Sequence, residues 1–315
     1  MFMLDRVAMT AAVTENEVMD TLEEAFRLFE AGDFYMPDRI SVVQGNDTLL
    51  YMPCFAGDYF GTKLLTLFPE NQAKGFPYIH GLYILHRRDN GEIIAQMDGS
   101  FLTALRTGAA GGIGMRHFSR EDTRSAGIVG CGTQGFQQAL TVCKVRPIED
   151  LYLFDAHNKD MAGWAARLSA RLHNPKPRIH ICNRVEELLE GSEIVVTATT
   201  SMTPVLPDDP ALLGGKLFVA IGSYKPNMRE LPPALWQVTD ATITELPYAI
   251  EESGDLSQPI EEGWLRERHI QYTGRLIFGN DKPVPGNGRS VLYKSVGMGL
   301  FDLMAAKLIY EKLSK

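Results

Sequence analysis

The sequence predicts a two-domain α/β protein, in which one domain holds a parallel sheet and the other a mixed α+β fold. Its 315 residues correspond to two domains at about 100–200 residues each. The pattern also changes near residue 124, beyond which short apolar strands alternate with helical segments. We therefore expect one domain at residues 1–119 with 288–315, and the other at residues 120–287.

Composition and charge argue against several classes of protein. Apolar residues make up 45% of the chain and charged residues 22%, which is ordinary for a globular protein. A net charge of -8 disfavours nucleic acids and anionic membranes as partners, because both need a basic surface. The sequence has no apolar run of about 18 residues and no signal-peptide core, so we expect no membrane span. Four isolated cysteines without metal-ligand spacing indicate a cytoplasmic protein with no metal site.

The first domain begins with a clear helix signal. Thr14 and Glu17 have the spacing of a capping box, apolar residues follow at helical intervals, and Gly32 ends the segment. Strands are expected at residues 41–55, 60–68, 78–87 and 92–97. Because two of their connections carry turn signals, we predict a mostly antiparallel sheet with helices.

The second domain shows an alternation of strands and helices. Strands are expected at residues 126–129, 151–154, 178–181, 194–197, 217–221 and 241–244, and helices at 134–145, 159–172 and 185–189. Such alternation predicts βαβ units and a parallel sheet. Residues 290–315 are expected to form a long helical stretch that returns to the first domain.

A glycine-rich turn joins the first strand and helix of the second domain. Gly130-Cys131-Gly132-Thr133-Gln134-Gly135 matches the pattern GxGxxG. In a Rossmann-type nucleotide domain, these glycines give a tight turn, a close approach to the pyrophosphate and tight packing of helix on strand. A glycine turn without a ligand is the alternative, but the preceding strand and the following helix favour the nucleotide site.

Asp155 supports this interpretation and indicates which dinucleotide binds. It closes the second strand, 20 residues after Gly135, which is the spacing of the acid that binds the adenosine ribose hydroxyls. A carboxylate at that point repels a 2′-phosphate, so we predict NAD(H) rather than NADP(H) as the cofactor.

Lys63 and Arg106 are candidate substrate-binding residues in the first domain. Lys63 lies inside an apolar strand, where an unpaired charge is costly, and a lysine with a lowered pKa serves as an acid or base. Arg106 precedes a run of glycines and alanines in a predicted helix and suits bidentate binding of a carboxylate. A structural ion pair and a surface arginine explain the two residues equally well. The loop residue Arg39 has no local distinction.

Several segments together make the chain resemble the ornithine cyclodeaminase/mu-crystallin family. The Leu-Thr-Ala-Leu-Arg-Thr block at 102–107, combined with the downstream GxGTQ at 130–134, is quite specific. The other matching pieces are Pro37-Asp38-Arg39, Gly61-Thr62-Lys63, Pro69-Glu70-Asn71, Met97-Asp98-Gly99 and Lys294-Ser295-Val296-Gly297. The resemblance covers nearly the whole chain.

The resemblance implies a fold and a set of site residues. The family joins a Rossmann domain to a mixed α+β, substrate-binding domain that dimerises through its sheet, so we expect a homodimer or a higher even oligomer. By resemblance, Arg39, Lys63 and Arg106 surround a substrate carboxylate, and the strand end at 197–200 approaches the nicotinamide. The expected cofactor-binding residues are Gly130, Gly132, Thr133, Gln134, Asp155, Thr197, Thr199 and Ser295.

The sequence departs from the family at one position that bears on the reaction. Cyclodeaminases resembling this chain carry an aspartate in the third position of the block at 222–231, where Tyr224 stands here. We therefore expect an NADH-dependent imine (ketimine) reductase or amino-acid dehydrogenase acting on a small α-imino or α-amino acid, with Lys63 and Tyr224 as catalytic residues. The alternatives are an NAD-recycling cyclodeaminase and a non-catalytic ligand-binding protein like some mu-crystallins.

Overall fold

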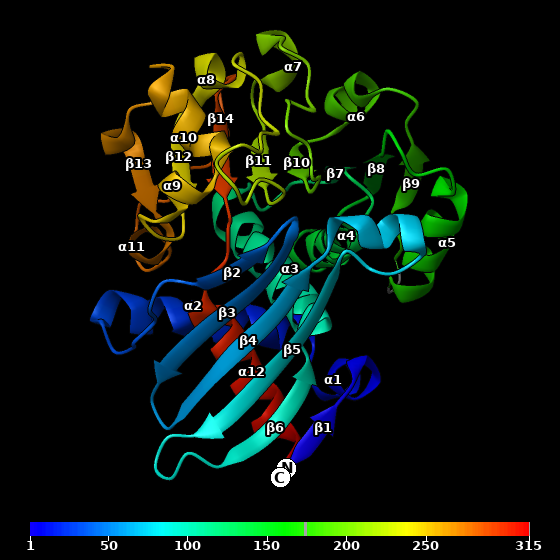
Figure 1. Cartoon of the computed structure of the whole chain (residues 1–315). Helices are drawn as coiled ribbons and strands as arrows, with labels where there is room; N and C mark the ends of the chain where they lie inside the picture. Colours follow the sequence, from blue (N-terminus) through cyan, green and yellow to red (C-terminus); the bar gives the residue numbers. More distant parts are fainter. Residues whose placement is uncertain (173–174, 315) are drawn as a thin grey trace. The chain divides into compact units, whose positions relative to one another are not determined.

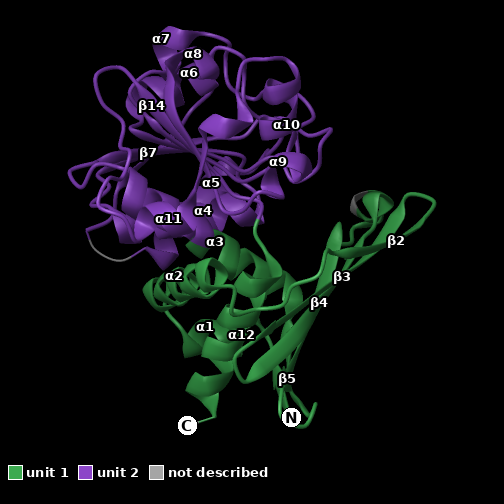
Figure 2. Ribbon diagram, turned by 90° about the vertical axis from the view of Figure 1, so that its left-hand side faces the viewer, with its two compact units in different colours: residues 1–109, 297–315 green, residues 110–296 purple. Residues whose placement is uncertain are grey.

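The protein divides into two compact units, one inserted into the other along the chain. The computed structural model describes residues 1–172 and 175–314. Unit 1 comprises Met1–Ala109 and Gly297–Lys315, and unit 2 comprises Ala110–Val296 (Figures 1 and 2). These divisions differ from the expected ones near residues 119 and 288, because the helix α3 (Gly99–Phe118) contributes to both units and the second sheet extends to residue 294.

Unit 1 is built on a six-stranded sheet that is antiparallel except for its first pair. The strands lie in the order β1 (Phe2–Leu4), β6 (Ile93–Asp98), β5 (Ile79–Arg87), β4 (Tyr59–Leu67), β3 (Asp47–Ala56) and β2 (Ile40–Gln44). The pair that runs parallel is β1 with β6. The expectation of one strand at 41–55 is wrong, because a turn at Gly45, with φ of 60°, separates β2 from β3.

Helices of unit 1 pack on one face of this sheet. They are α1 (Arg6–Ala12), α2 (Glu15–Ala31) and α12 (Gly299–Leu313), and a 3-10 turn spans Pro69–Lys74. The C-terminal α12 contacts β3, β4, β5 and α2 (Figure 2). The capping box that begins α2 is present, with Thr14 and Glu17 bonding each other's backbone N–H groups. The last helix of the chain therefore completes the core of its first unit.

Unit 2 is built on an eight-stranded parallel sheet. Its order is β13 (Ile270–Tyr272), β12 (Thr239–Thr244), β14 (Ser290–Lys294), β11 (Leu217–Ala220), β10 (Ile194–Thr197), β7 (Ser125–Val129), β8 (Asp150–Phe154) and β9 (Arg178–Ile181). Counted in sequence from β7, the five strands from β9 to β11 have the order 3-2-1-4-5 of a dinucleotide-binding sheet, and β14, the last strand in sequence, takes the sixth place. The predicted parallel-sheet domain is confirmed.

Two strands of unit 2 differ from the sequence prediction. β14 was expected to be helical, but all five of its residues are buried between β11 and β12. A strand that is buried on both faces lacks the alternation that marks a half-exposed strand. β13, with only three residues, was not predicted.

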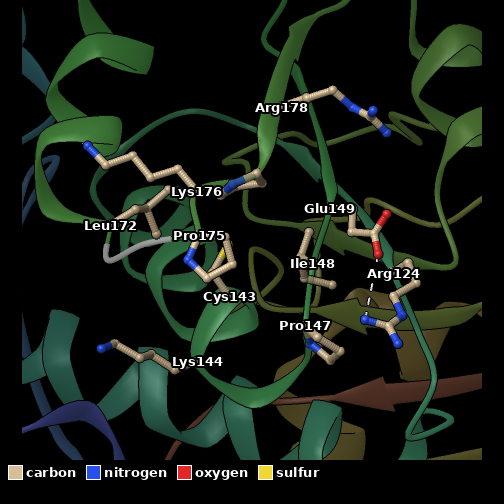
Figure 3. Close-up of a pocket in the computed structure, with 11 residues that line it drawn as sticks. Arg124, Cys143, Lys144, Pro147, Ile148, Glu149, Leu172, Pro175, Lys176 and Arg178 are labelled. Carbon is tan, nitrogen blue, oxygen red and sulfur yellow. Dashed lines mark ion pairs between the residues drawn. The ribbon is translucent and has the colours of Figure 1, made fainter.

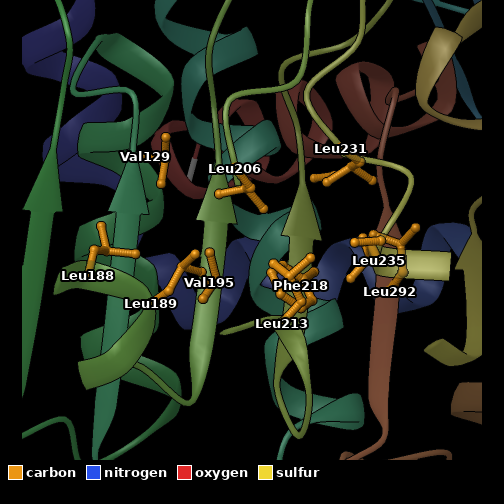
Figure 4. Packing of buried hydrophobic residues seen from close by; sticks show 12 residues of the cluster. Val129, Leu188, Leu189, Val195, Leu206, Leu213, Phe218, Leu231, Leu235 and Leu292 are labelled. Carbon is orange, nitrogen blue, oxygen red and sulfur yellow. The ribbon is translucent and has the colours of Figure 1, made fainter. Parts of the chain in front are cut away.

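Helices and a continuous apolar core support the parallel sheet. The helices of unit 2 after α3 are α4 (Thr133–Val145), α5 (Met161–Arg171), α6 (Val185–Gly191), α7 (Pro210–Leu213), α8 (Leu235–Val238), α9 (Ala249–Glu252), α10 (Gly254–Glu261) and α11 (Thr273–Ile277), with a 3-10 turn at Glu267–His269. In Figure 4, Val195 and Phe218 of the central strands belong to one apolar cluster with Leu189 of α6 and Leu235 of α8. This packing holds the strand ends in fixed positions. No described helix is long and apolar enough to cross a membrane.

Candidate nucleotide and substrate sites

The three glycines of the GxGxxG turn each meet a different steric demand. Gly130 has a φ of 96°, a conformation that side chains rarely adopt. A Cβ on Gly135 would overlap the carbonyl oxygen of Gly130, so the helix α4 and the strand β7 approach closely there. Gly132 is the N-cap of α4, and a Cβ on it would meet no atom within 4 Å. The space in front of the helix N-terminus is therefore open, as a pyrophosphate requires.

Asp155 connects the glycine turn to the end of β8. Its carboxylate accepts the backbone N–H of Cys131 at 2.7 Å and those of His157 and Asn158 at 2.8 Å each. The expected ribose-binding acid thus also fixes the loop that would hold the pyrophosphate. Thr133 and Gln134 follow in the first turn of α4, where the side chain of Thr133 is exposed.

The strand ends beyond β10 and β14 carry the remaining predicted nucleotide residues. Thr197 ends β10 and is 1% exposed, and its hydroxyl donates to Glu230 Oε2 at 2.9 Å. Thr199 is half-buried and bonds Oε1 of the same carboxylate. Ser295, also buried, donates to Glu245 Oε1 at 2.5 Å. These hydroxyls are used to hold protein loops at the carboxyl edge of the sheet.

A cavity of about 480 Å³ in unit 2 lies at the other edge of the sheet. Arg124, Glu149 and Arg178, which line it, come at the amino ends of β7, β8 and β9 (Figure 3). Nucleotides bind outside the carboxyl ends of strands in such sheets. This cavity is therefore separate from the predicted dinucleotide site.

Unit 1 holds a buried cluster of charged side chains. Lys63 of β4, Arg106 of α3 and Asp302 of α12 are 1%, 6% and 0% exposed. Lys63 Nζ donates to Asp302 Oδ2 at 2.7 Å, and Arg106 Nε donates to Asp302 Oδ1 at 3.0 Å. One carboxylate thus pairs with two cations, which leaves the cluster with a net positive charge suited to an anionic ligand.

The surroundings of this cluster set its protonation. Burial lowers the pKa of Lys63 from 10.5 to about 8, although Asp302 opposes the shift. Arg106 and, to a smaller extent, Arg39 lower the pKa of Lys63 further by charge repulsion. Burial alone would raise the pKa of Asp302, but Lys63 and Arg106 outweigh it and the pKa is lowered. A lysine with a pKa near 8 exchanges protons readily at neutral pH.

Gly297 explains how the arginine is accommodated. It has a φ of 73°, and a Cβ on it would overlap the Arg106 guanidinium. The Nε of Arg106 donates to Asp302, and its terminal nitrogens lie beside Gly297.

Unit 1 contains all three residues that are expected around the substrate carboxylate, namely Arg39, Lys63 and Arg106.

Tyr224 belongs to unit 2, in the loop that follows β11. Its side chain is half-buried, and Lys225 Nζ lies 5.7 Å from the centre of its ring. The structure thus divides the predicted catalytic pair, with Lys63 in unit 1 and Tyr224 in unit 2. Among the described residues there is no group of His, Cys, Asp and Glu side chains suited to a metal ion.

Sequence reasoning missed Asp302 and the structural role of Glu230. Asp302 is the one acidic residue in the apolar segment 299–309 of α12, and a charge in such a segment needs a buried partner. The charge in an apolar helix could have suggested Asp302 as the partner of Lys63, but the two residues are 239 positions apart in the sequence. Glu230 lies in a loop with no periodicity, so its burial was not visible in the sequence.

Comparison with known proteins places these sites in a wider context. The family model described as the ornithine cyclodeaminase/mu-crystallin family matches residues 1–315. A Delta(1)-pyrroline-2-carboxylate reductase of Bacillus cereus is 31% identical over 306 residues, which are 95% of this chain and 93% of that protein.

Solved structures show the same arrangement of the backbone. The Thermococcus litoralis Delta(1)-pyrroline-2-carboxylate reductase, in complex with NADH and L-proline, superposes with a TM-score of 0.91 at 31% identity, covering 100% of this chain and 98% of the other. An archaeal alanine dehydrogenase dimer with bound NAD gives a TM-score of 0.89 at 26% identity, covering 99% and 96%.

The geometry of the glycine turn predicts different effects on stability for two alanine variants. Gly132→Ala adds a methyl group to open space at an ordinary φ, so the free energy of unfolding should change by less than about 0.5 kcal/mol while NADH binding weakens. Gly135→Ala forces α4 away from β7 and should cost about 1–3 kcal/mol. Urea unfolding and fluorescence titration with NADH measure the two effects. Equal destabilisation by both variants would contradict this account of the turn.

Proposed function

Because the chain belongs to the ornithine cyclodeaminase/mu-crystallin family, we propose that it is an NADH-dependent reductase of a small α-imino acid. The observation that carries this proposal is the buried cluster of Lys63, Asp302 and Arg106. It combines a carboxylate-binding arginine with a proton donor whose pKa is about 8. The relatives that act on a cyclic imino acid or on alanine support the same substrate class.

NAD(H) is the proposed cofactor, held by unit 2. The open space before Gly132, the close packing at Gly135 and the acid Asp155 all fit a dinucleotide without a 2′-phosphate. Two similar solved structures contain NADH or NAD, which supports this assignment. The proposed binding residues are those expected from the sequence, with Thr197 and Ser295 acting through the backbone that they fix.

The proposed mechanism uses the charged cluster to bind and protonate the substrate. Arg106 and Arg39 bind the α-carboxylate of the imino acid, and Lys63 holds a proton for the imine nitrogen. NADH supplies the hydride for the imine carbon when it is bound. Addition of one hydride and one proton converts C=N into an amine, and Lys63 is left neutral until it regains a proton from water. Asp302 holds the side chain of Lys63 and the guanidinium of Arg106 in place.

A reaction test separates this proposal from a cyclodeaminase activity. The protein should oxidise NADH when given Δ1-pyrroline-2-carboxylate or an α-imino acid formed from pyruvate and an amine. With ornithine and catalytic NAD it should form little proline, because Tyr224 stands where cyclodeaminases of the family carry an aspartate. Absorbance at the NADH band and amino-acid analysis measure both reactions. Rapid proline formation from ornithine, without imine reduction, would overturn the proposal.

The pKa of Lys63 predicts the alkaline limit of the reaction. Reduction needs the ammonium form of Lys63, so kcat/KM for reduction should fall about tenfold per pH unit above pH 8. Over the same pH range, kcat/KM for the reverse oxidation should rise. Asp302→Asn removes the carboxylate that raises the pKa of Lys63, so the midpoint should move to lower pH. Circular dichroism checks that the variant is folded. An unchanged or higher midpoint would count against Lys63 as the acid.

Asp155 predicts a preference for NADH over NADPH. A carboxylate within a few ångströms of a 2′-phosphate gives a repulsion of about 1–4 kcal/mol at effective dielectric constants of about 20–80. Asp155→Asn removes the charge and keeps an acceptor oxygen for the N–H of Cys131, while its amide nitrogen replaces the oxygen that accepts from His157 and Asn158. The ratio of kcat/KM for the two cofactors should narrow by about tenfold or more. Equal use of NADPH by the unmodified protein would refute the preference.

We also propose a homodimer, or a higher even oligomer, that forms through the sheet of unit 1. The face opposite α12 carries a cross-strand row of Tyr51, Leu64 and Leu82, and Leu82 is 37% exposed. Apolar side chains on an open sheet face favour burial against a second copy. A cytoplasmic location is proposed for this oligomer, since all four cysteines are free.

A pair of matched variants tests the dimer. Leu82→Asp places a charge in the proposed interface and should give a monomer, because an unpaired buried charge is costly. Ile181→Asp changes an apolar residue of comparable exposure, 45%, on β9 of unit 2 and should leave the mass unchanged. Light scattering measures the molar mass of each variant and of the unmodified protein. A monomeric unmodified protein, or dissociation by Ile181→Asp alone, would contradict the proposed interface.

A further inference from the structure

A second buried carboxylate, Glu230, joins the loops that follow two central strands of unit 2. It is 0% exposed and accepts four hydrogen bonds, two on each oxygen. Oε1 receives the backbone N–H of Thr199 at 2.7 Å and its hydroxyl at 2.8 Å. Oε2 receives the hydroxyl of Thr197 at 2.9 Å and the backbone N–H of Gly222 at 2.7 Å. The end of β10 and the end of β11 are thus held by one group.

The two loops are close enough that no side chain fits between them. A Cβ on Gly222 would overlap the carbonyl oxygen of Thr199 and lie 2.5 Å from Glu230 Oε1. Gly222 also has an ordinary backbone conformation, since its φ is not in the left-handed region. The glycine is therefore required by the close approach that Glu230 maintains.

Further buried charges hold Glu230 in turn. Asp255 Oδ1 accepts the backbone N–H groups of Glu230 at 2.7 Å and of Leu231 at 3.1 Å. Its other oxygen, Oδ2, lies 3.5 Å from the ammonium of Lys294, the last residue of β14. Asp255 and Lys294 are both 0% exposed. The chain of contacts from β14 through Asp255 to Glu230 fixes the carboxylate relative to the sheet.

The order of the strands indicates which half of a bound dinucleotide lies near the loops that Glu230 joins. In a sheet of the order 3-2-1-4-5-6, the adenosine half lies beyond the second strand and the nicotinamide half beyond the fourth and fifth. Here those are β8, which ends near Asp155, and β10 and β11, which end at the partners of Glu230. The side chain of Glu230 thus bonds the loops of the nicotinamide half, and Thr199 of the first loop also lies beside Gly130 of the glycine turn.

We propose that Glu230 is a positioning residue for the nicotinamide half of NAD(H), acting through Thr199 and Gly222 rather than by touching the cofactor. This inference rests on the proposed binding of NAD(H) to unit 2. It implies that the affinity for the adenosine half depends much less on Glu230 than the affinity for the whole dinucleotide does. It also implies that the face of the nicotinamide ring from which hydride leaves is set by the same contacts.

Binding of NADH and of ADP-ribose to the full chain tests this proposal. ADP-ribose lacks the nicotinamide, so it reports only the half near Asp155. Glu230→Gln keeps the size of the side chain but turns an amide N–H toward backbone donors. We expect its Kd for NADH to rise at least about tenfold and its Kd for ADP-ribose to stay within about twofold of the unmodified protein. An equal rise for both ligands, or no change for either, would overturn the proposal.

A milder pair of variants covers the case in which Glu230→Gln does not fold. Thr199→Val removes one donor from a half-buried position, and Thr199→Ser keeps it. The valine variant should weaken NADH binding more than ADP-ribose binding, and the serine variant, which restores the hydroxyl, should recover most of the NADH affinity that the valine variant loses. Equal behaviour of the two variants would contradict the role of this contact.

Stereospecific deuterium labelling at C4 of NADH gives an independent readout. The unmodified protein should transfer only one of the two C4 hydrogens. The Glu230→Gln variant should also transfer a measurable share of the other hydrogen. If this variant binds NADH more weakly but stays fully stereospecific, Glu230 does not position the nicotinamide ring. If the unmodified protein binds NADH but reduces no imine, the proposed reaction is wrong, and the binding comparison still decides the role of Glu230.

Discussion

The carboxylate of Asp302 is the constraint on which unit 1 depends. Two cations, Lys63 and Arg106, are withdrawn from water on elements far apart in the sequence, and a buried charge without a partner is very costly. Both are satisfied because α12 crosses the sheet beside β4 with its aspartate facing inward. The proposed substrate site and the packing of the first unit therefore depend on the same contacts.

Unit 2 uses buried carboxylates in a different way. Glu230, Asp255 and Glu245 accept backbone N–H groups and hydroxyls at the ends of strands, where the ladder of the sheet stops and loops begin. A carboxylate that accepts several hydrogen bonds has little freedom to move, and its charge strengthens those bonds. It therefore fixes loops more firmly than a neutral side chain does. These acids fix the positions of the loops at the carboxyl ends of the strands.

The sequence predicted the regular parts of the fold better than the sites. The glycine turn, Asp155 and the alternation of strands and helices specified the parallel sheet because each is a local signal. β14 was misjudged because burial on both faces removes alternation. Lys63 and Arg106 were recognised as unusual, but their shared partner lies on the last helix, and no local pattern connects residues that far apart. The role of Glu230 depends on loop contacts that only the folded chain defines.

The placement of α12 has a consequence for how the chain folds during synthesis. Unit 2 lies entirely within Ala110–Val296, so it leaves the ribosome before Asp302 does. Until that residue emerges, the strand with Lys63 and the helix with Arg106 lack the carboxylate that pairs with them in the folded protein, and water must keep them solvated. The first unit of the sequence is thus completed after the second, because the charged cluster forms only once Asp302 of α12 has been translated.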